Sequence, residues 1–236
     1  MPNTEHPDRI CIGELQHQLS VVLPEVELAL TPLPLTPEVL LWLVSDLMAD
    51  RPLPPDVVNQ LMTAPPYWSL CWASGQILAQ QILQNPAWVE GKTVVDVGAG
   101  SGVVAIAAAK AGARRVVACD IDADARLACQ VNAKANKVSL LVSDDLDRAL
   151  DGVEVITAAD ILYDRDNLAL LSRFRGTARV LLADSRLPDL NPPGFHRQGE
   201  WSAVTWPDVG ELQQFNQVRV FDTETPSSSA GLKTGF

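Results

Sequence analysis

Basic residues are scarce in this chain of 236 residues. Lysine and arginine together number 18 against 29 aspartates and glutamates, which gives a formal net charge of −11 at pH 7. A protein that binds a phosphate backbone needs clustered Lys and Arg to displace counterions, so this composition argues against nucleic acid as a partner. An acidic surface instead suits a basic protein partner.

Metal-binding and membrane-spanning patterns are also missing. The four cysteines, Cys11, Cys71, Cys119 and Cys129, form no Cys-x-x-Cys pair, and the three histidines lie far apart in the sequence. This distribution predicts no metal site and favours a reducing compartment. No apolar run is long enough to span a bilayer, and no charged segment followed by an apolar one opens the sequence. We therefore expect a cytoplasmic protein that neither enters a membrane nor is exported.

Residues 93–102 carry the strongest functional signal. The segment Thr-Val-Val-Asp-Val-Gly-Ala-Gly-Ser-Gly joins an apolar strand to an acid, Asp96, and then places glycines at Gly98, Gly100 and Gly102. Glycine has no Cβ, so the backbone can turn sharply from strand to helix and a ligand can approach the first N–H groups of that helix. The spacing predicts a cofactor-binding loop.

A second acid, Asp120, ends the next apolar run, about twenty residues beyond Gly98, which is where nucleotide-binding βαβ units hold a ribose. A dinucleotide loop has the pattern Gly-x-Gly-x-x-Gly, but its third glycine is replaced here by Val103. A carboxylate at Asp96 would repel a pyrophosphate and attract the ammonium of a methionine-like group. The loop therefore favours S-adenosylmethionine over NAD.

From residue 92 onward, strand and helix patterns alternate. This order predicts a Rossmann-like, doubly wound α/β fold with seven mostly parallel strands. Helices are expected over residues 74–85, 103–111 and 122–136. Strands are expected near residues 93–97, 115–119, 138–142, 154–159, 178–183, 201–206 and 217–222. Ligands of such sheets bind beyond the carboxyl ends of the strands, where Asp96, Asp120, Asp144 or Asp145, and Asp160 fall.

The two ends of the chain have a different character. Residues 1–66 are interrupted by prolines, which predicts an N-terminal cap or extension of helices and loops. Within it, Thr36-Pro37-Glu38 has the features of a helix start, with an N-cap threonine and an early proline, so a helix is expected through Asp50. The domain that carries the chemistry is expected over residues 67–222, and the polar residues 223–236 are expected to form a flexible tail.

Four segments together resemble the class I, or seven-β-strand, S-adenosylmethionine-dependent methyltransferases. They are residues 65–76, residues 91–108, Asp120-Ile-Asp, and Asp160-Ile-Leu-Tyr-Asp. Within that class they resemble the family that methylates lysine in the β subunit of electron transfer flavoprotein, together with its bacterial relatives described as similar to nicotinamide N-methylases. The resemblance runs from about residue 20 to residue 222, including a strand-like segment over residues 23–30.

The resemblance implies a set of cofactor-binding residues, namely Trp72, Asp96, Gly98, Ala99, Gly100, Gly102, Asp120, Ile121, Asp144 and Asp160. The glycine loop with Asp96 would hold the methionine part of S-adenosylmethionine. Asp120 and Ile121 would hold the ribose and the adenine, and Asp144 would lie at the adenine edge. Trp72 would line the pocket and offer an indole face to the sulfonium, although its spacing from Trp68 also fits a packed helical face.

The motif Asp160-x-x-Tyr163 matches the family's Asp-x-x-Tyr motif and implies catalytic roles for both residues near the acceptor nitrogen. The alternative interpretation is that Asp160 caps the next turn and that Tyr163 packs on its own stem. Two departures from the family bear on the substrate. Ala159 replaces a glycine that relatives often have, and Ala183-Asp-Ser-Arg-Leu-Pro replaces an Asp-Pro-Gly-Arg type of turn.

Several functions remain open at this point. The first is a protein-lysine N-methyltransferase acting on electron transfer flavoprotein β subunit or another basic protein. The second is a small-molecule, nicotinamide-like N-methyltransferase in which residues 37–66 form a lid. The third is a non-catalytic protein that binds S-adenosylmethionine. Nucleic-acid methylation ranks last, because the charge is unfavourable and no Asn-Pro-Pro-Tyr motif follows the fourth strand.

Overall fold

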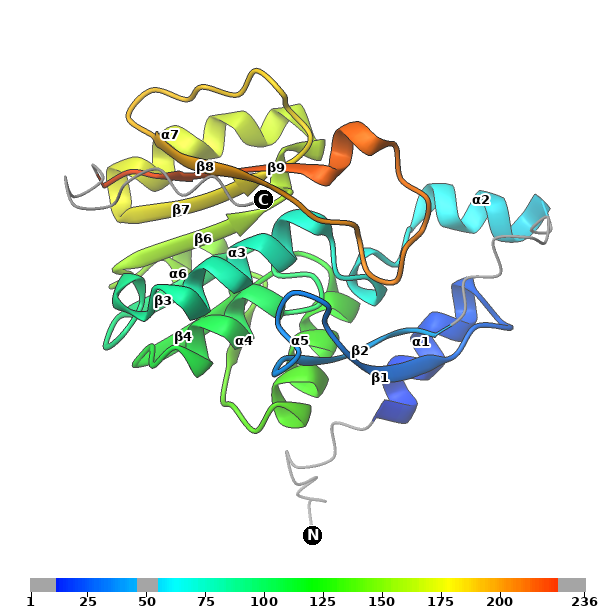
Figure 1. The fold of residues 1–236 in the computed structure, drawn as a ribbon. Coiled ribbons are helices and arrows are strands. Elements are labelled where there is room, and N and C mark those ends of the chain that lie inside the picture. The colour runs from blue at the N-terminus through cyan, green and yellow to red at the C-terminus, as the bar shows by residue number, and fades with distance from the viewer. Residues whose placement is uncertain (1–11, 46–54, 225–236) are drawn as a thin grey trace, which may run out of the picture.

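A seven-stranded sheet forms the centre of the computed structural model, which describes residues 12–45 and 55–224 (Figure 1). The strands are β3 (Thr93–Val97), β4 (Arg115–Cys119), β5 (Leu141–Ser143), β6 (Val155–Ala159), β7 (Arg179–Asp184), β8 (His196–Ser202) and β9 (Gln217–Asp222). They lie in the order β5-β4-β3-β6-β7-β9-β8. Neighbours from β5 to β7 are parallel, and β9 runs antiparallel to both β7 and β8. The predicted mostly parallel, doubly wound sheet is confirmed.

Helices cover both faces of this sheet. One face packs against α3 (Ala73–Gln84), α4 (Val103–Lys110) and part of α5 (Ala123–Ala135). The other packs against α6 (Leu146–Ala149) and α7 (Leu168–Thr177). Side chains alternate along each strand, so Val94 of β3 joins the first apolar cluster and Val95 joins the second. Among the described residues, no helix combines the length and apolar character that a membrane span requires.

Local patterns predicted most elements of this sheet domain well. The helices expected over 74–85, 103–111 and 122–136 are α3, α4 and α5, and the first two strands have the predicted bounds. Helix α4 is apolar on nearly every side because residues Val103 to Ala108 are all buried between the sheet and α3. The strand expected over 138–142 begins later, at Leu141, because the helix before it ends in a turn.

The strand predicted over residues 201–206 is wrong in its position. Strand β8 covers His196–Ser202, and Trp206 instead forms an isolated bridge with Cys71, in which each backbone N–H donates to the other residue's carbonyl at 2.8 Å. Strand β8 lies at the edge of the sheet and pairs with β9 alone. An edge strand needs few apolar residues, so His-Arg-Gln-Gly-Glu lacked the apolar signal of a strand.

The helix predicted from Thr36 to Asp50 is also wrong. Residues Leu40–Val44 form β2, which pairs antiparallel with β1 (Leu28–Pro32), and residues 46–50 lie outside the described residues. The side chains of Val39, Leu41 and Leu43 are all fully buried, so the buried positions recur every second residue as in a strand. The extension therefore contains a β-hairpin as well as helices α1 (Ile12–Val22) and α2 (Pro55–Thr63).

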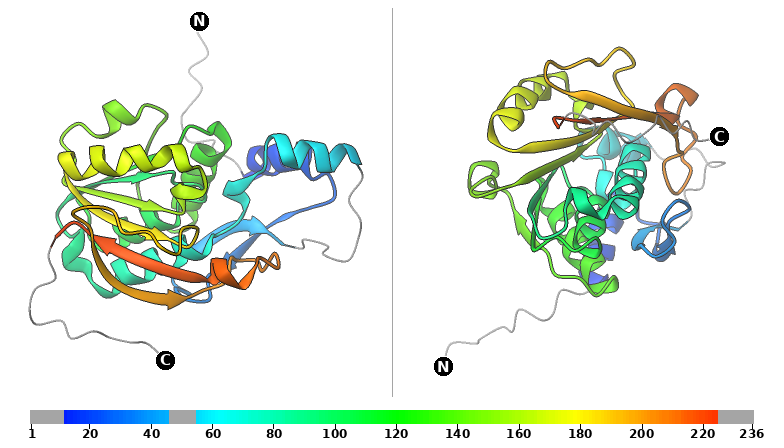
Figure 2. Two further views of the ribbon diagram at one scale, coloured as in Figure 1. Left: turned by 90° about the horizontal axis from the view of Figure 1, so that it is seen from above. Right: turned by 60° about the vertical axis from the view of Figure 1, so that its left-hand side comes forward.

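Asn132 of α5 and Asn136, the residue that ends this helix, hold the hairpin against the sheet domain. The Asn132 Oδ1 accepts a hydrogen bond from the Trp42 N–H at 2.7 Å. The Asn136 side chain both accepts from the Leu40 N–H at 3.0 Å and donates to the Leu40 carbonyl at 2.5 Å. Side-chain amides thus pair with the free backbone edge of β2 as a neighbouring strand would. Figure 2 shows α1, the hairpin and α2 gathered at one end of the molecule.

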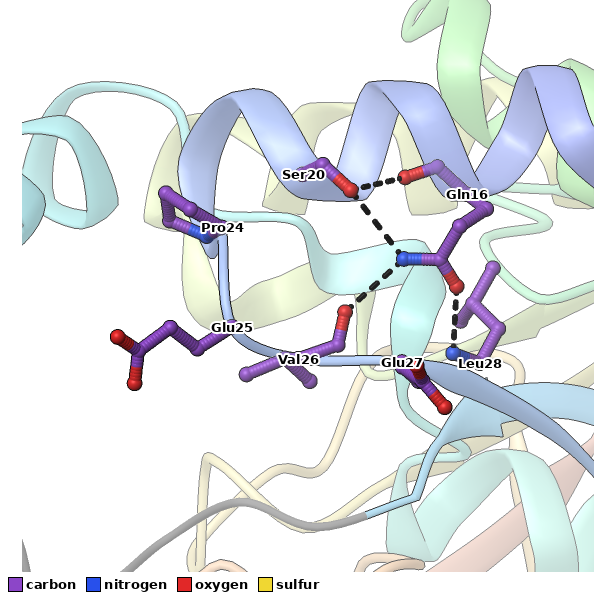
Figure 3. Close-up of a pocket in the computed structure, with 7 residues that line it drawn as sticks. All are labelled: Gln16, Ser20, Pro24, Glu25, Val26, Glu27 and Leu28. Atoms are coloured by element: carbon purple, nitrogen blue, oxygen red, sulfur yellow. Dashed lines mark hydrogen bonds between the residues drawn. The ribbon is translucent and has the colours of Figure 1, made fainter.

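Helix α1 is joined to the start of β1 by one glutamine (Figure 3). The Gln16 Nε2 donates to the Val26 carbonyl at 2.9 Å, and its Oε1 accepts from the Leu28 N–H at 2.8 Å. The Ser20 hydroxyl donates to the Gln16 carbonyl at 2.8 Å. These residues line a surface pocket whose polar groups are largely paired with one another.

Replacing Asn132 by alanine is expected to lower the free energy of unfolding by about 3 kcal/mol, because it leaves two buried backbone groups unpaired. The Asn132 side chain is fully buried, and besides Trp42 it pairs with the Ser101 carbonyl at 2.9 Å. Urea unfolding followed by circular dichroism measures the change. Lys134→Ala, at an exposed position of the same helix, is the matched control. A similar loss in both variants would contradict the role of the amide.

Candidate functional site

The glycine loop turns the chain from β3 into α4 with three residues in the left-handed region. The φ angles of Gly98, Gly100 and Gly102 are +67°, +52° and +81°. A Cβ at Gly98 would lie 2.7 Å from Cγ2 of Ile161, and one at Gly102 would lie 3.1 Å from Cα of Cys129. A Cβ at Gly100 would meet nothing nearer than 4.0 Å. Packing therefore demands glycine at the outer two positions, whereas Gly100 borders open space that a ligand could fill.

Asp96 holds this loop from beneath. Its Oδ2 accepts from the Ala105 N–H of α4 at 3.1 Å, and its Oδ1 accepts from the Thr157 hydroxyl of β6 at 2.8 Å. The residue is 2% exposed, and burial raises the pKa of its carboxyl to about 7. Asp96 thus ties β3, β6 and α4 together, and its predicted contact with the methionine ammonium stays a prediction.

Replacing Asp96 by asparagine is expected to change how stability depends on pH. Burial holds the pKa of the folded protein's Asp96 carboxyl above the ordinary aspartate value of 3.8. The folded protein therefore keeps a proton that the unfolded chain loses, and this contribution to the free energy of unfolding is full below about pH 4 and lost by about pH 7. Asp96→Asn cannot ionise, so it should gain stability relative to wild type over that interval, by up to about 4 kcal/mol.

Urea unfolding of both proteins between pH 4.5 and 8 measures this difference. Asp151→Asn is the control. It removes the carboxylate of an exposed residue, so it tests the effect of losing a charge at the surface. A constant gap between wild type and Asp96→Asn at every pH would contradict the raised pKa.

The predicted adenosine contacts lie together at the ends of β4 and β5. The Asp120 Oδ2 accepts from the Gly100 N–H at 2.9 Å, its Oδ1 accepts from the Asp122 N–H at 3.0 Å, and burial raises the pKa of this carboxyl. The Arg126 Nη1 donates to the carbonyls of Asp120 and Ile121 at 2.8 and 3.0 Å. The Arg126 Nη2 also lies 3.8 Å from the exposed carboxylate of Asp144.

These residues fit a nucleoside. Ile121 is 92% exposed beside the Asp120 carboxylate, so an apolar side chain and a hydrogen-bond acceptor stand next to each other at the loop. A carboxylate can accept from ribose hydroxyls, and a bare isoleucine can pack on an adenine face. Ala99 is buried, and the N–H groups of Gly98 and Ala99 both donate to the Cys119 carbonyl. The backbone of the loop is therefore fixed to β4 before any ligand binds.

Asp160 lies at the carboxyl end of β6 in the left-handed conformation, with φ +53° and ψ +24°. Its Oδ1 accepts from the hydroxyls of Ser74 and Ser185 at 2.7 and 2.8 Å and from the Ser185 N–H at 3.2 Å. Its Oδ2 accepts from the Ser74 N–H at 3.3 Å. The alternative interpretation, that this acid caps the next turn, is wrong, because its side chain makes no capping bond there. The carboxylate instead joins α3 to the turn after β7.

Three aromatic rings, those of Tyr67, Trp72 and Tyr163, form a cluster that includes the tyrosine of the Asp-x-x-Tyr motif. Tyr163 is 62% exposed, and its ring centroid lies 5.5 Å from that of Tyr67, which is itself 45% exposed. The Tyr67 ring lies 5.7 Å from the Trp72 ring, and the Trp72 Nε1 donates to the Tyr67 carbonyl at 2.9 Å. The cation that faces Trp72 is the guanidinium of Arg186, at 5.3 Å. The structure therefore places Trp72 beside Asp-x-x-Tyr, between Tyr67 and Arg186.

Four residues of this region were missed from the sequence: Tyr67, Ser74, Ser185 and Arg186. Ser185 and Arg186 directly follow β7, and the rule that ligands bind beyond the carboxyl ends of parallel strands could have identified them. They lie within the very turn that departs from the family. Ser74 follows Trp72 at the start of α3, far from Asp160 in sequence, and only the fold joins the two.

Several known proteins similar in sequence to this chain are methyltransferases. Residues 77–164 match the family described as ribosomal protein L11 methyltransferase (PrmA). The electron transfer flavoprotein beta subunit lysine methyltransferase of Mus musculus is 36% identical over 143 residues, covering 56% of this chain and 56% of that protein. A homolog of that enzyme from Caenorhabditis elegans is 30% identical over 181 residues, covering 67% of this chain and 72% of that protein.

The chain spans about half the length of most of the vertebrate relatives that it matches, from 40% to 64%. Among solved structures, a protein from Pyrococcus horikoshii described as a candidate RNA methyltransferase superposes with a TM-score of 0.51 and 19% identity, over 63% of this chain and 79% of that one. This likeness supports the fold alone.

Proposed function

The chain belongs to the family of electron transfer flavoprotein β subunit lysine methyltransferases, and on this premise we propose that it transfers a methyl group from S-adenosylmethionine to a lysine amine of a protein. Electron transfer flavoprotein β subunit is the first acceptor to test, because the relatives are named for it. Other basic proteins are the wider class, given the net charge of −11.

One juxtaposition carries this proposal. The buried Asp160 carboxylate belongs to one short segment with Ile161, which lies against Gly98 of the glycine loop, and with Tyr163, whose exposed ring contacts that of Tyr67. An acid at this position can hold a cationic nitrogen, and the rings can flank an aliphatic stem or a cation. A cofactor seated on the glycine loop and an amine between the tyrosines would thus meet at Asp160.

Within the proposal, the glycine loop and Asp96 hold the methionine end of the cofactor, and Asp120, Ile121 and Asp144 hold its nucleoside end. When bound, S-adenosylmethionine supplies a methyl group on a positively charged sulfur. The protein's own contribution is then mainly to bring the acceptor nitrogen into line, since positioning can supply much of the rate enhancement of such a displacement.

The acceptor amine must first lose a proton. For a lysine of ordinary pKa this costs roughly 4 to 5 kcal/mol at pH 7. Packing of the amine against the Tyr67 and Tyr163 rings lowers that cost, because partial desolvation disfavours the charged form. The Asp160 carboxylate acts later, when positive charge returns to the nitrogen that accepts the methyl group, and it stabilises and orients that charge. Tyr163 closes over the methylene stem.

The open tyrosine pair favours a protein acceptor over an enclosed small molecule. The small-molecule alternative placed a lid over residues 37–66, but Leu40–Val44 of that segment form β2 and lie against α5. The proposal also includes a cytoplasmic location. The described cysteines, Cys71, Cys119 and Cys129, are buried and unpaired, which is compatible with a reducing compartment.

Incubation with tritiated S-adenosylmethionine tests the proposal. The acceptors are purified electron transfer flavoprotein and, separately, a cell extract. A labelled protein band, with the methyl group located on lysine by mass spectrometry, supports the proposal. Label confined to the small-molecule fraction would favour the nicotinamide-like alternative. Calorimetric binding of the cofactor without any transfer would favour a non-catalytic binding protein.

A further inference from the structure

A tight turn after β7 places Arg186 beside the Asp160 carboxylate. The Asp184 Oδ1 accepts from the N–H groups of Arg186 and Leu187 at 3.1 and 2.8 Å, which closes the turn. Ser185, in the middle of the turn, donates twice to Asp160. Asp184 and Ser185 are 0% and 1% exposed, so the turn has little freedom to move. The turn therefore holds the Arg186 backbone in a fixed position next to Asp160.

The guanidinium of Arg186 is held on several sides. Its Nη1 lies 3.0 Å from Oε1 of Glu211, and its Nε lies 3.8 Å from Oδ1 of Asp160. Its central carbon lies over two rings, at 4.6 Å from the centroid of Phe215 and 5.3 Å from that of Trp72. The Nε is buried and makes no hydrogen bond within the described residues. Arg186 is therefore preorganised beside Asp160, and its buried Nε is a donor without a hydrogen-bond partner among the described residues.

Acids outnumber bases at this point. Asp160 after β6, Asp184 of β7 and Glu211 of the loop before β9 are the acids near Arg186, while the Tyr67 ring packs against Trp72 and the Tyr163 ring packs against Tyr67. Burial raises the pKa of Asp184 to about 6. Within residues 12–45 and 55–224, Arg186 is the only cationic side chain within 4 Å of the Asp160 or Glu211 carboxylates.

The positive charge of Arg186 affects the protonation of the acceptor lysine. A bare carboxylate cluster beside the acceptor would stabilise the ammonium form, which cannot attack a methyl group. We propose that Arg186 is a positioning residue that controls the protonation of the acceptor amine: its positive charge offsets Asp160 and Glu211, so that the amine can release its proton to solvent before it accepts the methyl group. This inference rests on the proposed function and adds a role for the turn in which this chain departs from its family.

Arg186→Met tests the inference through a pH profile. The methyl-transfer rate is measured from pH 7 to 10, above the titration of Asp184, with electron transfer flavoprotein as acceptor. The rate should rise with pH as the acceptor amine loses its proton. Loss of the guanidinium should move the midpoint of this rise upward by about one pH unit. The kcat at pH 7 then falls about tenfold and recovers at high pH, while KM for the acceptor stays level or falls. Arg186→Lys should restore the wild-type limb, because it restores the charge.

Glu211→Gln should shift the pH profile in the opposite direction, and it preserves the size of the side chain. Removal of this carboxylate leaves the Arg186 charge less compensated, so the rising limb should move to lower pH. Arg197→Met is the control for net charge alone, since Arg197 is exposed on β8 and pairs with Glu200 there. Its profile should match that of wild type.

The outcomes separate the two proposals. If wild type labels a small amine and no protein, the proposed function fails, and the pH profile is measured with that amine instead. If wild type labels no amine at all, both proposals are overturned. Folded Arg186→Met and Glu211→Gln proteins that lose rate equally at every pH would overturn the inference alone, because a purely structural role has that signature. Tighter acceptor binding with faster transfer in Arg186→Met would also overturn it, since Arg186 would then be occupying the acceptor's place.

Discussion

Replacement of Asp160 by alanine is expected to lower methyl transfer by about a thousandfold, the scale on which loss of one electrostatic group slows an enzyme. Cofactor affinity should change little, because the Asp160 bonds run to Ser74 and Ser185 and not to the glycine loop. Calorimetry with S-adenosylmethionine and a tritium-transfer assay measure the two quantities on the same preparation. Equal loss of both would assign Asp160 to the cofactor.

The alanine variant also disturbs the backbone, so a gentler variant is needed beside it. Asp160 has φ +53°, a conformation that costs most residues about 1 to 2 kcal/mol and that asparagine tolerates better than alanine. Asp160→Asn keeps an oxygen for the Ser74 and Ser185 hydroxyls, and it removes the charge together with the acceptor for the Ser74 N–H. Transfer should still fall by about a hundredfold. An active Asp160→Asn protein would show that the carboxylate is structural and that its charge has no part in the reaction.

Replacement of Gly98 by alanine is expected to have the second large effect, with cofactor affinity reduced by at least about a hundredfold, equivalent to about 3 kcal/mol. The new Cβ would lie 2.7 Å from Cγ2 of Ile161, so either the loop or the Asp-x-x-Tyr segment must shift. Either shift would separate the glycine loop from the Asp-x-x-Tyr segment. Calorimetric titration with S-adenosylmethionine and with its demethylated product measures the loss.

Gly152→Ala is the matched control for backbone strain. Gly152 has φ +68°, nearly the same as the +67° of Gly98, and a Cβ there would meet nothing within 4 Å. Both variants should lose about 1 to 2 kcal/mol of stability from the left-handed conformation. Gly98→Ala alone should lose further stability and cofactor affinity. Equal behaviour of the two would mean that the contact with Ile161 relaxes at no cost.

Prediction from the sequence succeeded where the signal is local. The glycines of residues 98–102 adopt the left-handed backbone that their spacing predicts. Asp96, Asp120 and Asp160 each lie at the end of an apolar strand, so short segments of sequence predicted their positions at the carboxyl ends of the strands. It failed for β2 because the run Leu-Leu-Trp-Leu-Val is apolar enough for a helix or a strand. The extended conformation is stabilised by Asn132 and Asn136, about ninety residues away, whose side-chain amides pair with the β2 backbone.

The partners of each acid also depended on the fold. Nothing local indicated that Asp96 would spend both oxygens on Thr157 and Ala105, or that Asp160 would meet Ser74, Ser185 and Arg186. The sequence alone determined the cofactor loop and the order of strands and helices, because glycine conformation and apolar periodicity act within a few residues. Which charges face one another depends on the folded chain, because parallel strands bring together ends that a whole crossover helix separates along the sequence.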